Sequence, residues 1–103
     1  MNDIPPSGPY RSSPVFDQRS LPAALRREHR TKAGVWAVIR VFEGELKLTL
    51  ADSGEVLMLS PGAPGIVQPD QPHHVEALGS MLMQVDFYYQ RPDPHALGSG
   101  LRG

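Results

Sequence analysis

Short β-type segments separated by glycine and proline turns occupy most of the chain from Val35 to Tyr89. They restrict its fold more than any other feature. Residues 45–50 alternate strictly, with three leucines on one face and charged or polar residues on the other, as in a strand that has one buried face. Similar segments cover residues 35–42, 55–59, 66–68, 73–78 and 81–89. Many short strands at this spacing predict an all-β sandwich or barrel and not a βαβ fold.

The break at Glu43-Gly44 predicts a hairpin between residues 35–42 and 45–50, and Asp52-Ser53-Gly54 predicts the next turn. The segment Ser20–Arg26 predicts one short helical turn with Ser20 as its N-cap. Residues 1–14 are rich in proline and serine and have few apolar anchors. We therefore expect a flexible arm over 1–14, one domain over 15–90 and a flexible tail over 91–103.

The composition limits the chemistry. The chain has 103 residues, a formal net charge of −1 and no cysteine. We expect one small core and no attraction to nucleic acid or membranes. Any metal must bind to histidine, carboxylate or amide ligands. The chain shows no apolar signal core at its N-terminus and no apolar run that could span a bilayer, and we expect a cytoplasmic protein.

A histidine at the start of one strand is the first candidate site residue. Pro69 and Pro72 frame a tight turn that leads directly into His73. A side chain at that position can reach into the mouth of a barrel. His74 then points to the opposite face, so the two imidazoles are not expected to share an ion. The alternative is a surface or hydrogen-bonded histidine.

The last strand contains the second candidate. Gln84 and Asp86 share a face with Leu82 and Tyr88. A carboxylate in an apolar strand is costly unless it is paired or coordinated. Asp86 therefore requires an arginine partner, for which Arg40 is a candidate, or a hydrogen-bonded neighbour, or a metal.

His29 is the third candidate, and alone it would be interpreted as an exposed histidine after a basic run. Together, His29, His73 and Asp86 would bring two imidazoles and a carboxylate from three distant segments. Such a set leaves coordination positions open, which suits Zn, Fe, Mn or Ni without selecting among them.

Three motifs in this order resemble one known family. They are His29-Arg30-Thr31-Lys32-Ala33-Gly34-Val35-Trp36, then Pro72-His73-His74-Val75-Glu76, then Gln84-Val85-Asp86-Phe87-Tyr88. The combination is similar to the tellurite-resistance protein B-like domains, which are small and cupin-like. The resemblance runs from about Val15 to Tyr89.

The resemblance implies a double-stranded β-helix barrel, the jelly roll, with a metal in its mouth held by His29, His73 and Asp86. Zinc is the first candidate, with iron, manganese or nickel as alternatives. The general cupin first motif, H-x-H followed by Glu and Gly, is not intact here, and methyl transfer is not expected because no methyltransferase region is present. Further candidates for the ligand pocket are Gln84, Glu76, Lys32, Arg40, Trp36 and Tyr88.

The expected function is a metal-containing binding module for a small molecule or oxyanion, related to tellurite resistance or stress. Lys32 and Arg40 would supply positive charge near the mouth. One alternative is a metal-dependent enzyme of the oxygenase or isomerase type. Another is a metal-free barrel that dimerises through an apolar face of Met81, Met83, Val85 and Phe87. A homodimer is expected.

Overall fold

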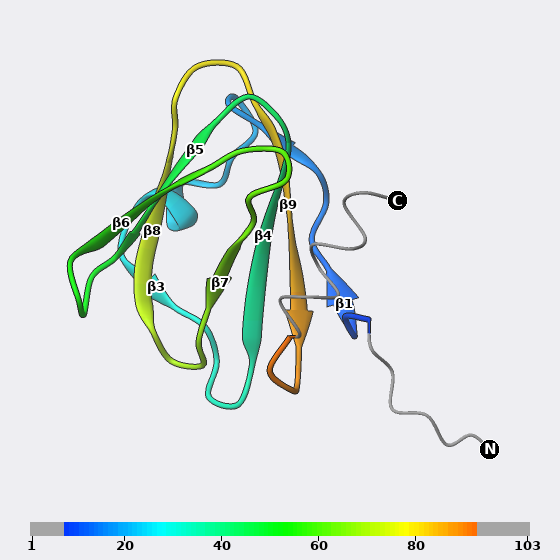
Figure 1. Ribbon diagram of the computed structural model, residues 1–103, viewed down its shortest axis with the longest axis vertical. Helices are drawn as coiled ribbons and strands as arrows, with labels where there is room; N and C mark the ends of the chain where they lie inside the picture. Colours follow the sequence, from blue (N-terminus) through cyan, green and yellow to red (C-terminus); the bar gives the residue numbers. More distant parts are fainter. Residues whose placement is uncertain (1–7, 93–103) are drawn as a thin grey trace.

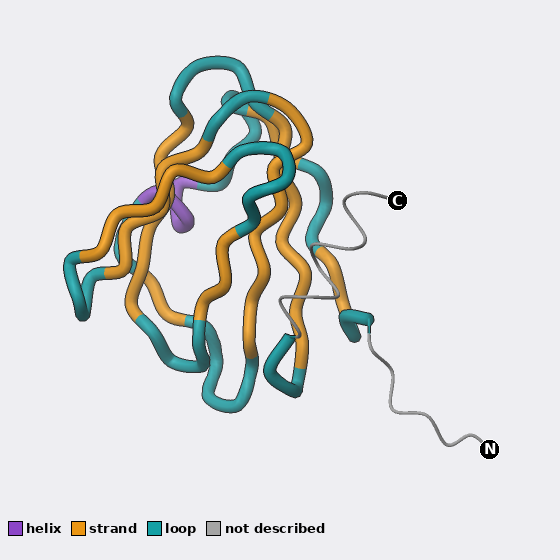
Figure 2. Tube along the Cα trace, viewed as in Figure 1, coloured by secondary structure: helices purple, strands orange, loops and turns teal. Residues whose placement is uncertain are grey.

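The structure is a computed structural model that describes residues 8–92. Within them the chain is almost entirely β-structure, with one 3-10 turn (Figures 1 and 2). The elements in chain order are β1 (Arg11–Ser12), β2 (Phe16–Asp17), η1 (Ala23–Arg26), β3 (His29–Arg30), β4 (Trp36–Glu43), β5 (Leu46–Leu50), β6 (Glu55–Leu59), β7 (Gly65–Val67), β8 (Pro72–Ala77) and β9 (Leu82–Tyr88).

The strands form two antiparallel sheets. One has the order β1-β9-β4-β7, with β2 also paired to β9, and the other has the order β3-β8-β5-β6. Figure 1 shows β4, β7 and β9 on one side of the molecule and β5, β6 and β8 on the other. The described residues therefore confirm the all-β class.

The hairpin expected between residues 35–42 and 45–50 is not formed. β4 pairs with β9 and β7, whereas β5 pairs with β6 and β8, so the two segments lie in different sheets. The chain changes sheets at Gly44, which has a φ of 76°. A residue with a side chain rarely adopts this backbone conformation. The turn at residues 52–54 does join a paired hairpin, β5 and β6.

The core lies where the inner faces of the sheets meet. In β5 the three leucines are buried and Lys47 and Thr49 are partly exposed, as the alternation predicts. Strands β4 and β9 contribute Ala37, Ile39, Val41, Met83 and Val85. The apolar positions of β9 that suggested a dimer interface therefore contribute to the core of the same chain.

The N-terminal part of the domain lies along β9. Arg11 is the register partner of Phe87, and Phe16 is the register partner of Met83. Part of the expected arm is thus paired to the sheet, while residues 1–7 and the expected tail from 93 onward lie outside the described residues.

The helical turn begins later than expected, and Ser20 does not cap it. Pro22 precedes η1 and makes no side-chain capping bond. Ser20 instead accepts a hydrogen bond from the backbone N–H of Asp17, and the Asp17 carboxylate accepts bonds from the N–H groups of Arg19 and Ser20. Those backbone donors hold the pKa of the Asp17 carboxyl below its usual value. The local polar bonds form a turn before the helix, which competes with N-capping.

Within the described part of the chain, no helix has the length and hydropathy needed to cross a bilayer.

Candidate functional site

A cavity of about 450 Å³ opens between the inner faces of the sheets and the N-terminal segment. Its volume falls in the range of small-molecule sites, which is roughly 300–1,000 Å³. Most of the wall is apolar, from strands β4, β8 and β9 and from the segment around β2. These apolar residues include Phe16, Leu25, Val35, Ala37, Ile39, Val75, Met83, Val85 and Phe87.

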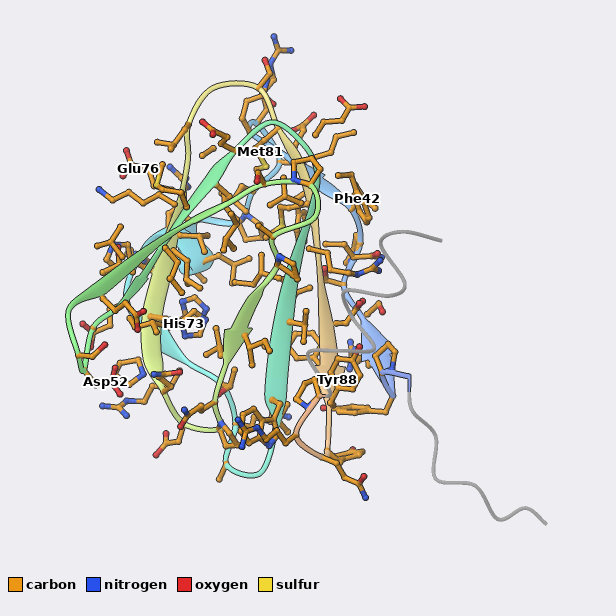
Figure 3. All side chains as sticks on the ribbon, viewed as in Figure 1. Phe42, Asp52, His73, Glu76, Met81 and Tyr88 are labelled. Carbon is orange, nitrogen blue, oxygen red and sulfur yellow. The ribbon has the colours of Figure 1, made fainter. Side chains whose placement is uncertain are left out.

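Two imidazoles line the same cavity. The antiparallel pairing of β3 with β8 makes His29 the register partner of His73. The ring centroids are 4.1 Å apart and the rings are tilted by 53°. His73 is 4% exposed, and its side chain lies in the interior beside β8 (Figure 3). The pairing of two short strands thus brings together histidines that are far apart in sequence.

Backbone carbonyls fix the tautomer of both rings. The Nδ1 atom of His29 is 2.9 Å from the carbonyl oxygen of Arg27, and the Nδ1 atom of His73 is 2.8 Å from that of Gln71. A carbonyl oxygen can only accept, so each Nδ1 must bear the proton and donate. In the neutral ring, Nε2 then keeps its lone pair. Both imidazoles therefore offer the same kind of nitrogen as an acceptor or a metal ligand.

Burial favours the neutral form of the buried ring. The pKa of His73 is lowered from its usual value, chiefly because burial disfavours the charged form, and His29 and His74 lower it further. The hydrogen bond to the Gln71 carbonyl raises the pKa of His73, but this effect is smaller than that of burial. A neutral imidazole is the form that binds metals.

A family model for the TehB-like domain matches residues 11–85 of this chain, well over half of its length. The chain belongs to the TehB-like domain family. The resemblance seen in the three sequence motifs is thus confirmed at the level of the family. A search of curated proteins found no match.

Two solved structures share the fold of this TehB-like domain. A protein from E. coli (strain K12) has a TM-score of 0.72 at 23% sequence identity, over 84% of this chain and 95% of that one. TehB from Haemophilus influenzae has a TM-score of 0.68 at 23% identity, over 91% of this chain and 39% of that one. The TehB-like chain therefore corresponds to about two fifths of that TehB structure.

Asp86 is not beside the histidines of the TehB-like domain. It lies on the face of β9 that points away from the cavity, where its Oδ2 is 2.6 Å from Nε of Arg40. The Ser12 hydroxyl donates to its Oδ1 at 2.6 Å. Of the alternatives left open by the sequence, the arginine partner and a hydrogen-bonded neighbour are both present. Among residues 8–92 no group of three or more His, Cys, Asp or Glu side chains is placed to hold a metal.

The hydrogen bonds around Arg40 continue to the N-terminal segment. Arg40 Nη2 donates to Gln84 Oε1 at 2.9 Å, and Gln84 Nε2 donates to the Ser13 carbonyl oxygen at 2.8 Å. Arg40 and Gln84 therefore hold β1 against β9 from the outer side of the sheet. Because residues 10–14 also line the cavity, this outer network positions part of the cavity wall.

Of the remaining candidate pocket residues, one lines the cavity and the others lie outside it. Lys32 lines the cavity. Trp36 and Tyr88 are register partners on the outer face of the sheet, where burial and then the Asp86 carboxylate raise the pKa of the Tyr88 hydroxyl. Glu76 is exposed on β8, opposite Lys47.

Sequence reasoning did not include three further parts of the wall among the site residues. These are the N-terminal segment around Tyr10–Pro14, which includes Arg11, the basic residue Arg30 in β3, and the apolar inner positions of β4 and β9. The alternation of β9 did indicate that Met83, Val85 and Phe87 share a face. The sequence contains no signal for the strand that pairs with β9 or for the cavity that this face lines.

Proposed function

We propose that this TehB-like domain is a small-molecule binding module in which the Nε2 atoms of His29 and His73 hold one divalent metal ion, zinc in the first instance. The observation that carries the proposal is the matched pair of imidazoles, 4.1 Å apart between ring centroids. Each has its Nδ1 engaged by a backbone carbonyl. Such second partners typically orient metal-binding histidines and raise their basicity.

The donor set fits a metal that keeps open positions. Two imidazole nitrogens suit Zn, Fe, Mn or Ni, and the positions that they leave are available to donor atoms of a bound molecule. When bound, the ion would supply a Lewis acid at the polar end of the cavity. The protein's own contribution is to orient the two rings, to favour the neutral form of His73 by burial, and to surround both rings with an apolar wall.

We also propose that the two sheets are the halves of a cupin-like jelly roll. The support is the path of the chain, which changes sheets at every connection from β3 to β9 except the β5–β6 hairpin and leaves a cavity between the sheets. A link to tellurite resistance or a related stress response is supported only by membership of the TehB-like family.

Metal analysis of protein purified without a histidine tag tests the proposal. We expect one equivalent of zinc per chain, and a weakening of at least about tenfold in zinc affinity in His29→Gln and in His73→Gln, because loss of even an outer-shell partner costs about 10–100-fold. His74→Gln is the matched control, since His74 follows His73 in β8 but does not line the cavity. Circular dichroism checks that each variant is folded. Stoichiometric zinc that persists in the double variant His29→Gln with His73→Gln, or no zinc uptake by the folded wild type, would overturn the metal proposal.

A further inference from the structure

The charges on the cavity wall all have the same sign. Among the described residues that line it, the charged side chains are Arg11, Arg30 and Lys32, and no aspartate or glutamate is among them. Arg30 has an outside partner, because its Nη1 lies 3.7 Å from an Asp70 carboxylate oxygen. Its Nη1 also donates to the Asp70 carbonyl. The wall thus favours a negatively charged group in the cavity over a positively charged one.

The position of Lys32 follows from the local backbone. The Thr31 hydroxyl donates to the carbonyl oxygen of Gln68 at 2.7 Å, and the N–H of Val35 donates to the carbonyl oxygen of Lys32 at 3.1 Å. These bonds tie both ends of the segment after β3. Lys32 therefore lies in a held turn three residues after His29, and it lines the cavity while remaining exposed to solvent.

The apolar part of the wall would make few contacts with a small ion. Ile39, Val75, Met83 and Val85 give the cavity an apolar interior, and each is buried in the core. An oxyanion of a few atoms would occupy a small part of about 450 Å³ and would contact little of this surface. Affinity from the apolar wall requires a ligand that displaces water from it.

Resting on the binding function proposed above, we infer that the ligand is an amphipathic anion: a small carboxylate with an apolar body. The carboxylate lies at the end formed by His29, His73 and Lys32. The apolar body lies along the inner faces of β4, β8 and β9. A single ligand of this kind would match both the cationic residues and the apolar interior of the cavity.

Octanoate is the probe. Acetate keeps the carboxylate but lacks the long alkyl group, and 1-octanol keeps the alkyl group but lacks the charge. Binding is measured by isothermal titration calorimetry on the full chain, with and without zinc. We expect octanoate to bind at least tenfold more tightly than acetate, because each buried methylene contributes about fourfold. We also expect it to bind at least tenfold more tightly than 1-octanol. Equal affinities for octanoate and acetate, or for octanoate and 1-octanol, would overturn the inference.

Two lysine variants distinguish a specific effect of the cavity residue Lys32 from a general effect of surface charge on octanoate binding. Lys32→Met should weaken octanoate binding severalfold and leave 1-octanol binding unchanged. Lys47→Met, on the outer face of β5 opposite Glu76, should alter neither. Equal effects of the two variants would refute the proposed orientation.

Zinc binding measured with no carboxylate present keeps the two proposals distinguishable. Zinc uptake without octanoate binding would overturn the ligand assignment and leave the metal proposal standing. Octanoate binding that is equally tight without zinc supports the ligand assignment and counts against a metal role in holding the carboxylate.

Discussion

Replacing Arg40 with methionine is expected to lower the free energy of unfolding by about 3 kcal/mol or more. The reason is the carboxylate that is left behind. Asp86 is 3% exposed and its Oδ2 is 2.6 Å from Nε of Arg40. The Arg40 side chain is 34% exposed but that of Asp86 only 4%, so removing the arginine leaves a buried carboxylate without its countercharge, which costs roughly 3–5 kcal/mol. Urea or thermal unfolding followed by circular dichroism measures the loss.

The same arginine-to-methionine change at Arg30 is the matched control. The Arg30–Asp70 pair is 3.7 Å apart, and its side chains are 56% and 67% exposed. Exposed pairs of this kind contribute about 0–1 kcal/mol, so Arg30→Met should have a small effect. The double variant Arg40→Met with Asp86→Leu should recover much of the loss, because well-packed apolar replacements of buried pairs are often neutral. Equal small losses in Arg40→Met and Arg30→Met would show that the Asp86 pair does not stabilise the sheet.

Of two matched glycine substitutions, Gly44→Ala is expected to lower the free energy of unfolding more than Gly54→Ala. Gly44 has a φ of 76° and Gly54 has a φ of 77°, so both variants incur a similar backbone cost of about 1–2 kcal/mol. Their surroundings differ. A Cβ at Gly44 would overlap the carbonyl oxygen of Ser80 and lie 2.9 Å from the Cβ of Met81, whereas a Cβ at Gly54 would have nothing within 4 Å.

We therefore expect Gly44→Ala to lose roughly 1–3 kcal/mol more than Gly54→Ala, the usual range for overpacking. Chemical denaturation of the two variants in parallel provides the measurement. A loss that is the same in both would mean that the chain does not approach Gly44 closely where it changes sheets.

The sequence predicts the strands well and their partners poorly. The alternation in residues 45–50 identifies the buried face of β5, since a period of two follows directly from strand geometry. It contains no information on which strand lies alongside. The residues on either side of Gly44 were therefore expected to form a hairpin, although β4 pairs with β9 far along the chain.

The candidate site shows the same division. The proline-framed turn before His73 and the family motifs identify the two histidines that the β3–β8 pairing brings together. For β9, the alternation groups Gln84 with Asp86 correctly but does not say which face is internal. Both faces of this sheet contain buried residues, Met83 on one and Asp86 on the other. Burial on both sides removes the contrast on which such a prediction depends.

The most direct test of the account is a two-bond ¹H–¹⁵N correlation spectrum of the histidine side chains, recorded with and without one equivalent of zinc. We predict that His29 and His73 carry their proton on Nδ1 in the metal-free protein, as their bonds to the carbonyls of Arg27 and Gln71 require. Zinc should then shift the Nε2 resonances of both rings and leave His74 unchanged. Protons on Nε2, or zinc shifts confined to His74, would contradict the proposal that these two imidazoles hold an ion in the cavity.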